Sequence, residues 1–171
     1  MKNTILIICL VLFSFTYSRE LVKTAQNAKS KTESLKILQD LVNNPEQARK
    51  MRKEIENASY WERKKWDELG EFIEKEIKTI SSSLPFKVDE YTTALNVAVV
   101  GKHIAYKYSL EIGYGNKDKI MKDMEKMITN NFCSSPMAAW LLIGYEMSFF
   151  YYSLDGVYLG GVIIDANTCG F

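Results

Sequence analysis

The stretch "SFFYYSLDGVYLGGVII", residues 148–164, decides how the C-terminal half of this chain folds. Asp155-Gly156 stands between two apolar runs, and this dipeptide is the strongest short-range signal for a β-hairpin. If these two residues form the loop, Phe150 lies opposite Gly161, and its ring covers backbone that glycine leaves bare. A longer loop starting at Ser153 would shift the register by one residue.

This hairpin is apolar or aromatic on both faces, which is typical of a central strand covered on both sides. Packing in the core is therefore the first interpretation of its rings. The alternative is an aromatic binding face, for which the candidate residues are Tyr106, Tyr108, Phe150 and Tyr152. A membrane span is not predicted, because the apolar stretch 137–152 is short and contains Glu146.

Upstream of the hairpin, residues 84–171 alternate between strand and helix patterns. Period-two alternation predicts strands near 93–100, 102–112, 144–153 and 157–165. Helical spacing predicts a helix beginning after Asn116 as its N-cap and a second, short helix opening at Pro136.

Residues 19–83 are predicted to be helical almost throughout. Leu35, Leu38 and Leu41 form one apolar stripe, and the helix that begins after Ser59 carries another. Ser59 and Glu62 have the spacing of a capping box. The stripes favour packing on the sheet, with a coiled-coil or partner-binding arm as the alternative.

These patterns together predict an α+β fold. The N-terminal helices pack on an antiparallel sheet of about four strands, in the order β-β-α-α-β-β after the helices. We expect the helical region 19–83 and the α+β core 84–171 to form one domain.

The N-terminus "MKNTILIICLVLFSFTYS", residues 1–18, has the layout of a secretory signal peptide. Lys2 precedes a short apolar region, and small residues lead to a cleavage site near Ser18. An uncleaved N-terminal anchor is the alternative interpretation. We therefore expect a periplasmic or secreted protein without a transmembrane span in the mature chain.

Two cysteines, Cys133 and Cys169, remain after such cleavage. An even pair in an exported protein predicts one structural disulfide. A metal site is not predicted, because His103 is the only histidine and a structural zinc needs four ligands. No cofactor-binding fingerprint occurs either.

The expected mature chain has equal numbers of basic and acidic residues once Lys2 is removed, and its halves differ little. This balance predicts no nucleic-acid partner, since such proteins carry a basic footprint.

No catalytic motif is present, and we assign no catalytic residue. His103 is the one side chain whose ordinary pKa suits proton transfer near neutral pH. No carboxylate near it in sequence suggests a partner. The chain is therefore not expected to be an enzyme, with an unfamiliar site around His103 as the alternative.

The segments "LPFKVDEYTTAL", "AYKYSL" and "CSSP…WLLIGYEMSFFYYSLDG", followed by a final cysteine, resemble small exported bacterial proteins of uncharacterised function. The resemblance covers residues 84–169. It implies a periplasmic single domain and assigns no residue roles.

The leading functional hypothesis is an exported protein that acts by contact with another envelope or exported protein. An inhibitor or immunity protein and an accessory subunit of an envelope machine are two versions of it. The alternatives are a small-ligand carrier that uses the aromatic hairpin and the enzyme with a site near His103.

Overall fold

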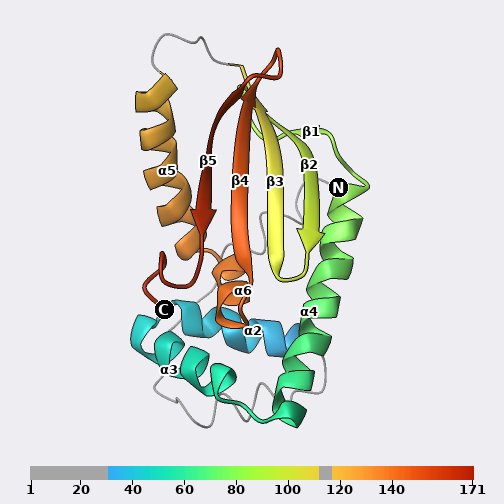
Figure 1. The fold of residues 1–171 in the computed structure, drawn as a ribbon, viewed down its shortest axis with the longest axis vertical. Helices are drawn as coiled ribbons and strands as arrows, with labels where there is room; N and C mark the ends of the chain where they lie inside the picture. Colours follow the sequence, from blue (N-terminus) through green and yellow to red (C-terminus); the bar gives the residue numbers. More distant parts are fainter. Residues whose placement is uncertain (1–30, 112–116) are drawn as a thin grey trace.

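A computed structural model of the chain describes residues 31–111 and 117–171 (Figure 1). Its helices are α2 (Lys31–Val42), α3 (Pro45–Glu56), α4 (Tyr60–Ser81), α5 (Lys117–Cys133) and α6 (Ala139–Leu142), with a 3₁₀ turn η3 (Pro136–Ala138) before α6. Its strands are β1 (Phe86–Lys87), β2 (Thr92–Val100), β3 (His103–Leu110), β4 (Glu146–Ser153) and β5 (Tyr158–Ile164). The predicted signal peptide, the alternative anchor and the predicted cap Asn116 lie outside the described residues.

The strands form one sheet in the order β1-β2-β3-β4-β5, which confirms the predicted α+β class. The expectation of an antiparallel sheet is corrected in one place, because β3 and β4 run parallel while the other neighbours are antiparallel. The sheet is therefore mixed. The short β1 adds a fifth strand to the four that were predicted.

The parallel pair has a clear cause in the connection between its strands. α5, η3 and α6 lie between β3 and β4, so the chain returns to the end of the sheet at which β3 began. Parallel neighbours need such a crossover, whereas a tight turn joins antiparallel ones. His103 consequently pairs with Glu146 at the start of both strands.

The hairpin has the predicted register in its central part. Phe150 lies opposite Gly161, and Tyr151 lies opposite Gly160. The turn is longer than the predicted Asp155-Gly156 loop and spans residues 154–157. A register shift after Tyr151 accommodates the extra length, so the longer loop does not move the central pairs.

The helices cover one face of the sheet and its lower end. α4 lies along β2 and α5 along β5, while α2 and α3 pack near α6 (Figure 1). The predicted capping box forms, because Glu62 accepts hydrogen bonds from the backbone N–H and the hydroxyl of Ser59. Side chains of the α2 and α4 stripes are buried, among them Leu38, Leu41, Trp66 and Ile73.

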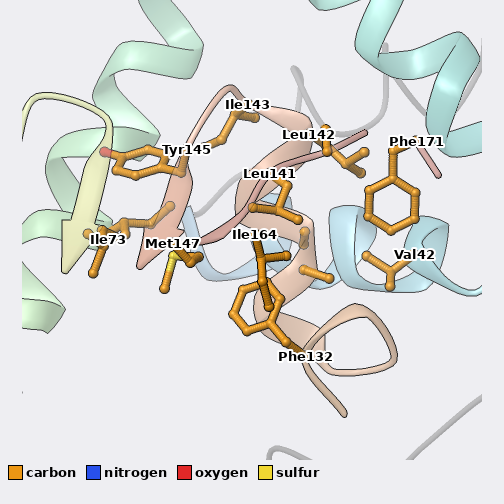
Figure 2. Packing of buried hydrophobic residues seen from close by; sticks show 14 of the residues in the cluster. Val42, Ile73, Phe132, Leu141, Leu142, Ile143, Tyr145, Met147, Ile164 and Phe171 are labelled. Atoms are coloured by element: carbon orange, nitrogen blue, oxygen red, sulfur yellow. The ribbon is translucent and has the colours of Figure 1, made fainter. Parts of the chain in front are cut away.

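One hydrophobic cluster joins these helices to the strands. Figure 2 shows Leu141, Leu142 and Ile164 gathered between Ile73 of α4 and Val42 of α2. These side chains come from segments far apart in sequence. The short helix α6 therefore fills the space at the lower end of the sheet.

The predicted disulfide between Cys133 and Cys169 is present. It joins the last residue of α5 to the turn after β5. Arg49 and Arg52 of α3 hold the same C-terminal segment by donating hydrogen bonds to the carbonyl oxygens of Gly170 and Phe171.

Candidate functional site

The four predicted binding residues lie on opposite faces of the sheet. Tyr106 pairs with Phe149 and Lys107 with Phe150, so alternate positions of β3 and β4 share a face. Tyr106 and Tyr108 therefore lie on the face that α4 and α5 cover, whereas Phe150 and Tyr152 point to the other side. We call the face under α4 and α5 the covered face, and the opposite face of the sheet the open face. The single aromatic surface considered from sequence is thus divided.

On the covered face the rings stack on one another. Tyr106 stacks on Phe149 with ring centroids 5.6 Å apart, and Tyr108 stacks on Tyr151 at 5.3 Å. Phe132 of α5 meets Phe149 edge-on at 5.8 Å. Such pairs stabilise the packing beyond the burial of their surface.

This burial also changes the acidity of the phenols. It raises the pKa of Tyr108 to about 12, because the phenolate loses hydration inside the protein. Burial raises the pKa of Tyr106 and of Tyr151 as well, with a smaller contribution from repulsion by Tyr108. These tyrosines stay neutral at physiological pH and act as packing groups.

On the open face a smaller group of rings is partly exposed. Tyr158 is 47% exposed, and its ring lies 5.4 Å from that of Tyr152 and 6.5 Å from that of Phe150. The Lys107 ammonium lies 4.4 Å from the centre of the Tyr152 ring, within cation–π range. Gly161 leaves room here, because a Cβ on it would lie 2.9 Å from the Phe150 ring.

The exposed apolar surface continues to the tip of the hairpin. Leu154 and Val157 in the turn are 68% and 51% exposed, and Ile163 on the open face is 57% exposed. We call the six apolar and aromatic residues on the hairpin the hairpin patch: Phe150, Tyr152, Leu154, Val157, Tyr158 and Ile163. Two of them, Phe150 and Tyr152, were predicted from the sequence. The other four were not, because their exposure depends on the turn and on what covers the sheet.

His103 has partners that are far from it in sequence. Its Nε2 lies 2.8 Å from the Ser148 hydroxyl, and its Nδ1 lies 3.2 Å from a Glu146 carboxylate oxygen. A hydroxyl, an imidazole and a carboxylate in this order have the connectivity of a nucleophile, a base and an orienting acid. Ser148, however, is completely buried, so a substrate does not reach its hydroxyl in this conformation. The arrangement holds the histidine ring against β4.

A cavity of about 350 Å³ lies at the same end of these strands, between α3, α4 and the start of β4, and Glu146 is among its lining residues. Its apolar wall comprises Ile55, Trp66, Leu141, Leu142, Ile143 and Tyr145. Gly70 of α4 leaves room for the Tyr145 ring, because a Cβ at this position would lie 2.8 Å from the phenolic oxygen. This cavity was not predicted from the sequence, since its lining comes from five separate segments.

Charged side chains surround the cavity, and most of them are paired. Arg52 bonds Glu56 at 2.9 Å. The Lys102 ammonium lies 3.6 Å from an Asp67 carboxylate oxygen, and it also donates a hydrogen bond of 3.0 Å to a backbone carbonyl of the cavity wall.

Asp165 at the same rim accepts hydrogen bonds from the Thr168 side chain and backbone, which lower the pKa of its carboxyl group. Arg63 also lines the cavity, and its guanidinium has no hydrogen-bond or ion-pair partner within the part of the chain that the structure describes.

Side chains of His, Cys, Asp and Glu within 31–111 and 117–171 nowhere gather in a group of three that could hold a metal ion. Each helix in those ranges is too short or too polar to cross a lipid bilayer.

No protein-family model and no curated protein matches this chain. Solved structures similar to it include a Pseudomonas aeruginosa protein assigned as secreted, which is 19% identical with a TM-score of 0.46, over 66% of this chain and 98% of that one. The type II secretion system pilotin AspS from Vibrio cholerae is 11% identical with a TM-score of 0.44, over 56% of this chain and 87% of its own. The type 2 secretion system pilotin EpsS from Vibrio vulnificus is 9% identical with a TM-score of 0.43, over 56% and 86%. These similarities are in three-dimensional structure, at low sequence identity.

Proposed function

We propose that this chain is an exported binding protein that acts by contact with another protein of the cell envelope, as an accessory subunit of an envelope machine or as an inhibitor. The hairpin patch is the observation that carries the proposal. Exposed aromatic and aliphatic side chains gather there on one strand pair.

The composition of the hairpin patch supports a protein partner. Tyrosine and phenylalanine are enriched in protein interfaces, where they bury large areas at a low cost in side-chain entropy. Phe150 and Tyr152 are half-buried against their neighbours and so have restricted positions, while Tyr158 and Ile163 are largely available to a partner. A rigid strand pair presents them together.

Charge near the hairpin patch favours a partner with an acidic rim. Lys107 lies over the Tyr152 ring, and Lys117 of α5 donates a hydrogen bond of 3.3 Å to the Tyr158 carbonyl oxygen. Both ammonium groups therefore flank the apolar surface. Carboxylates on the partner would complement them and orient the complex.

The disulfide supports an exported location. Such bonds persist in the periplasm and outside the cell and are rare in the reducing cytoplasm. The Cys133–Cys169 bond is therefore in keeping with the predicted signal peptide.

A pair of substitutions on the open face tests the proposal. Ile163→Asp places a charge in the hairpin patch, whereas Val100→Asp places the same charge on β2 of the same face, at a side chain that is 78% exposed. With the oxidised protein as bait in an envelope extract, we expect one stoichiometric partner. Ile163→Asp should lose it, and Val100→Asp should retain it. Equal capture by both variants, or no partner at all, would refute a role for the patch.

His103→Ala separates the contact protein from the alternative enzyme. Because the His103 ring bonds the buried Ser148 and lies outside the hairpin patch, capture of the partner should be unchanged. If His103→Ala still captured the partner but no longer supported the function of the complex, chemistry at the imidazole would be favoured instead.

A further inference from the structure

We propose that the start of α4 docks this protein on a lipid bilayer that carries anionic headgroups. Tyr60 and Trp61 enter the boundary between headgroups and acyl chains, while Arg63, Lys64 and Lys65 lie at the level of the lipid phosphates. We call these five residues the aromatic-basic turn. The proposal goes beyond the contact function of the hairpin patch and does not depend on it.

The two aromatic side chains of this turn take no part in the core. Trp61 is 73% exposed and Tyr60 is 69% exposed, the highest values of any aromatic side chain among residues 31–111 and 117–171. Their ring centroids lie 5.3 Å apart, and neither ring belongs to the hydrophobic cluster. Tryptophan is usually well covered in a folded protein, as Trp66 is on the same helix. Two such rings at one point of the surface therefore indicate a contact with something outside the chain.

Three cations lie one helical turn behind the rings. Residues three and four apart are neighbours on a helix, so Arg63 and Lys64 lie next to Tyr60, and Lys64 and Lys65 lie next to Trp61. All three cations are exposed. The cationic row follows the aromatic row by about 5 Å along the helix axis. Apolar side chains at a membrane surface reach about 5–10 Å into the boundary with the acyl chains, so this spacing leaves the cations level with the phosphates.

The direction of α4 and of its side chains supports this arrangement. In Figure 1, α4 runs along the length of the molecule and begins at the lower end, opposite the hairpin turn. Each Cα–Cβ bond of a helix tilts toward its N-terminus, so the rings lean past the start of α4. A projecting point of this kind suits insertion into a bilayer. A protein interface needs a broader surface, such as the hairpin patch provides.

The charge at this end of the molecule favours anionic lipids over neutral ones. Residues 49–65 carry seven basic and three acidic side chains, although the expected mature chain is balanced. The one acid within the turn is Glu62, whose carboxylate already accepts hydrogen bonds from the backbone N–H and the hydroxyl of Ser59. The next acids of α4, Asp67 and Glu68, lie farther from the helix start. Anionic headgroups therefore complement the local charge, and each Lys or Arg near them strengthens binding.

Sedimentation with lipid vesicles tests the proposal on the oxidised protein. We expect binding to vesicles of phosphatidylglycerol and phosphatidylethanolamine in equal amounts, and binding about tenfold weaker or more to phosphatidylcholine alone. Salt at about 0.5 M should weaken the binding, because it screens exposed charges. Tryptophan emission should shift to shorter wavelength as Trp61 leaves water. Trp61→Phe should keep most of the binding and lose this shift.

Two matched pairs of variants locate the contact. Lys64→Gln combined with Lys65→Gln should weaken vesicle binding by about tenfold or more, whereas Lys75→Gln combined with Lys78→Gln removes the same charge farther along α4 and should have little effect. Tyr60→Ser should also weaken binding. Its control is Tyr91→Ser, which removes a 55% exposed tyrosine at the other end of the sheet.

No binding to the anionic vesicles, equal binding to phosphatidylcholine, or equal losses in either matched pair would overturn the proposal. Loss of the captured envelope protein by Tyr60→Ser, without vesicle binding by the wild type, would assign the turn to a protein contact instead. Ile163→Asp in the hairpin patch should bind the vesicles as the wild type does, so failure of the patch and failure of the turn are distinguishable.

Discussion

The two faces of β4 show how one aromatic run is divided between two tasks. Phe149 and Tyr151 point to the covered face, where they stack on Tyr106 and Tyr108. Phe150, one position along, points to the open face and is half-buried. Strand alternation alone makes this division, since successive side chains leave opposite sides of the pleat. The same residue type therefore stabilises the fold at one position and is available for contact at the next.

Removing one ring from each face should give the largest difference in stability between the covered face and the open face. Phe149→Ala should lower the free energy of unfolding by about 3–5 kcal/mol, because it leaves a cavity among stacked rings. Phe150→Ala should cost about 1 kcal/mol, because solvent already reaches its ring. Urea unfolding of the oxidised proteins measures both values. Equal losses would mean that the open face is as well packed as the covered one.

The two adjacent glycines of β5 provide a second comparison of the two faces, with a smaller expected difference in stability. A Cβ at Gly161 would lie 2.9 Å from the Phe150 ring and 3.3 Å from a backbone oxygen, so Gly161→Ala should cost about 1–3 kcal/mol. A Cβ at Gly160 would lie 2.9 Å from Cε and 3.1 Å from Cγ of Met121, a flexible side chain that can change its rotamer. Gly160→Ala should therefore cost less in thermal unfolding. A larger loss at Gly160 would show that α5 packs rigidly on the covered face.

Alkaline pH tests the burial of the tyrosines on the covered face, with a still smaller expected effect on stability. The pKa of Tyr108 is about 12 in the folded protein, while an unfolded tyrosine has a pKa of about 10. Between these values the unfolded chain loses a proton that the folded chain keeps, so stability is complete below about pH 10 and falls as pH rises toward 12. Tyr108→Phe should therefore reduce the fall in the urea midpoint between about pH 9 and about pH 11. An identical fall in the variant would contradict the role of burial at this phenol.

The fold was largely predictable where the deciding interactions are local. The bounds of β2, β3, β4 and β5 lie within a few residues of the predicted strands. The Ser59 capping box and the pairing of Phe150 with Gly161 also follow from residues close together in sequence. The Cys133–Cys169 disulfide was predicted from the number of cysteines in the expected mature chain.

The candidate sites were less predictable, because pairing between distant segments creates them. Sequence alternation does not say which strands are neighbours or in which direction they run, so the parallel pairing of β3 with β4 was missed. That pairing brings Glu146 and Ser148 to His103. β1 has only two residues, too few to show a period. Arg63 and Trp66 were visible as helix residues, but the other walls of their cavity were not.

The single parallel pair has a consequence for the order of folding. β2 with β3, and β4 with β5, are each antiparallel neighbours in sequence, and such hairpins form in about 1–10 μs. The contact between β3 and β4 closes only after the whole crossover through α5 and α6 is in place, and loop closure of this kind slows folding. We therefore expect the boundary between the two hairpins to be the last part of the sheet to form, with an unpaired inner edge on each hairpin until then on which misassembly can begin.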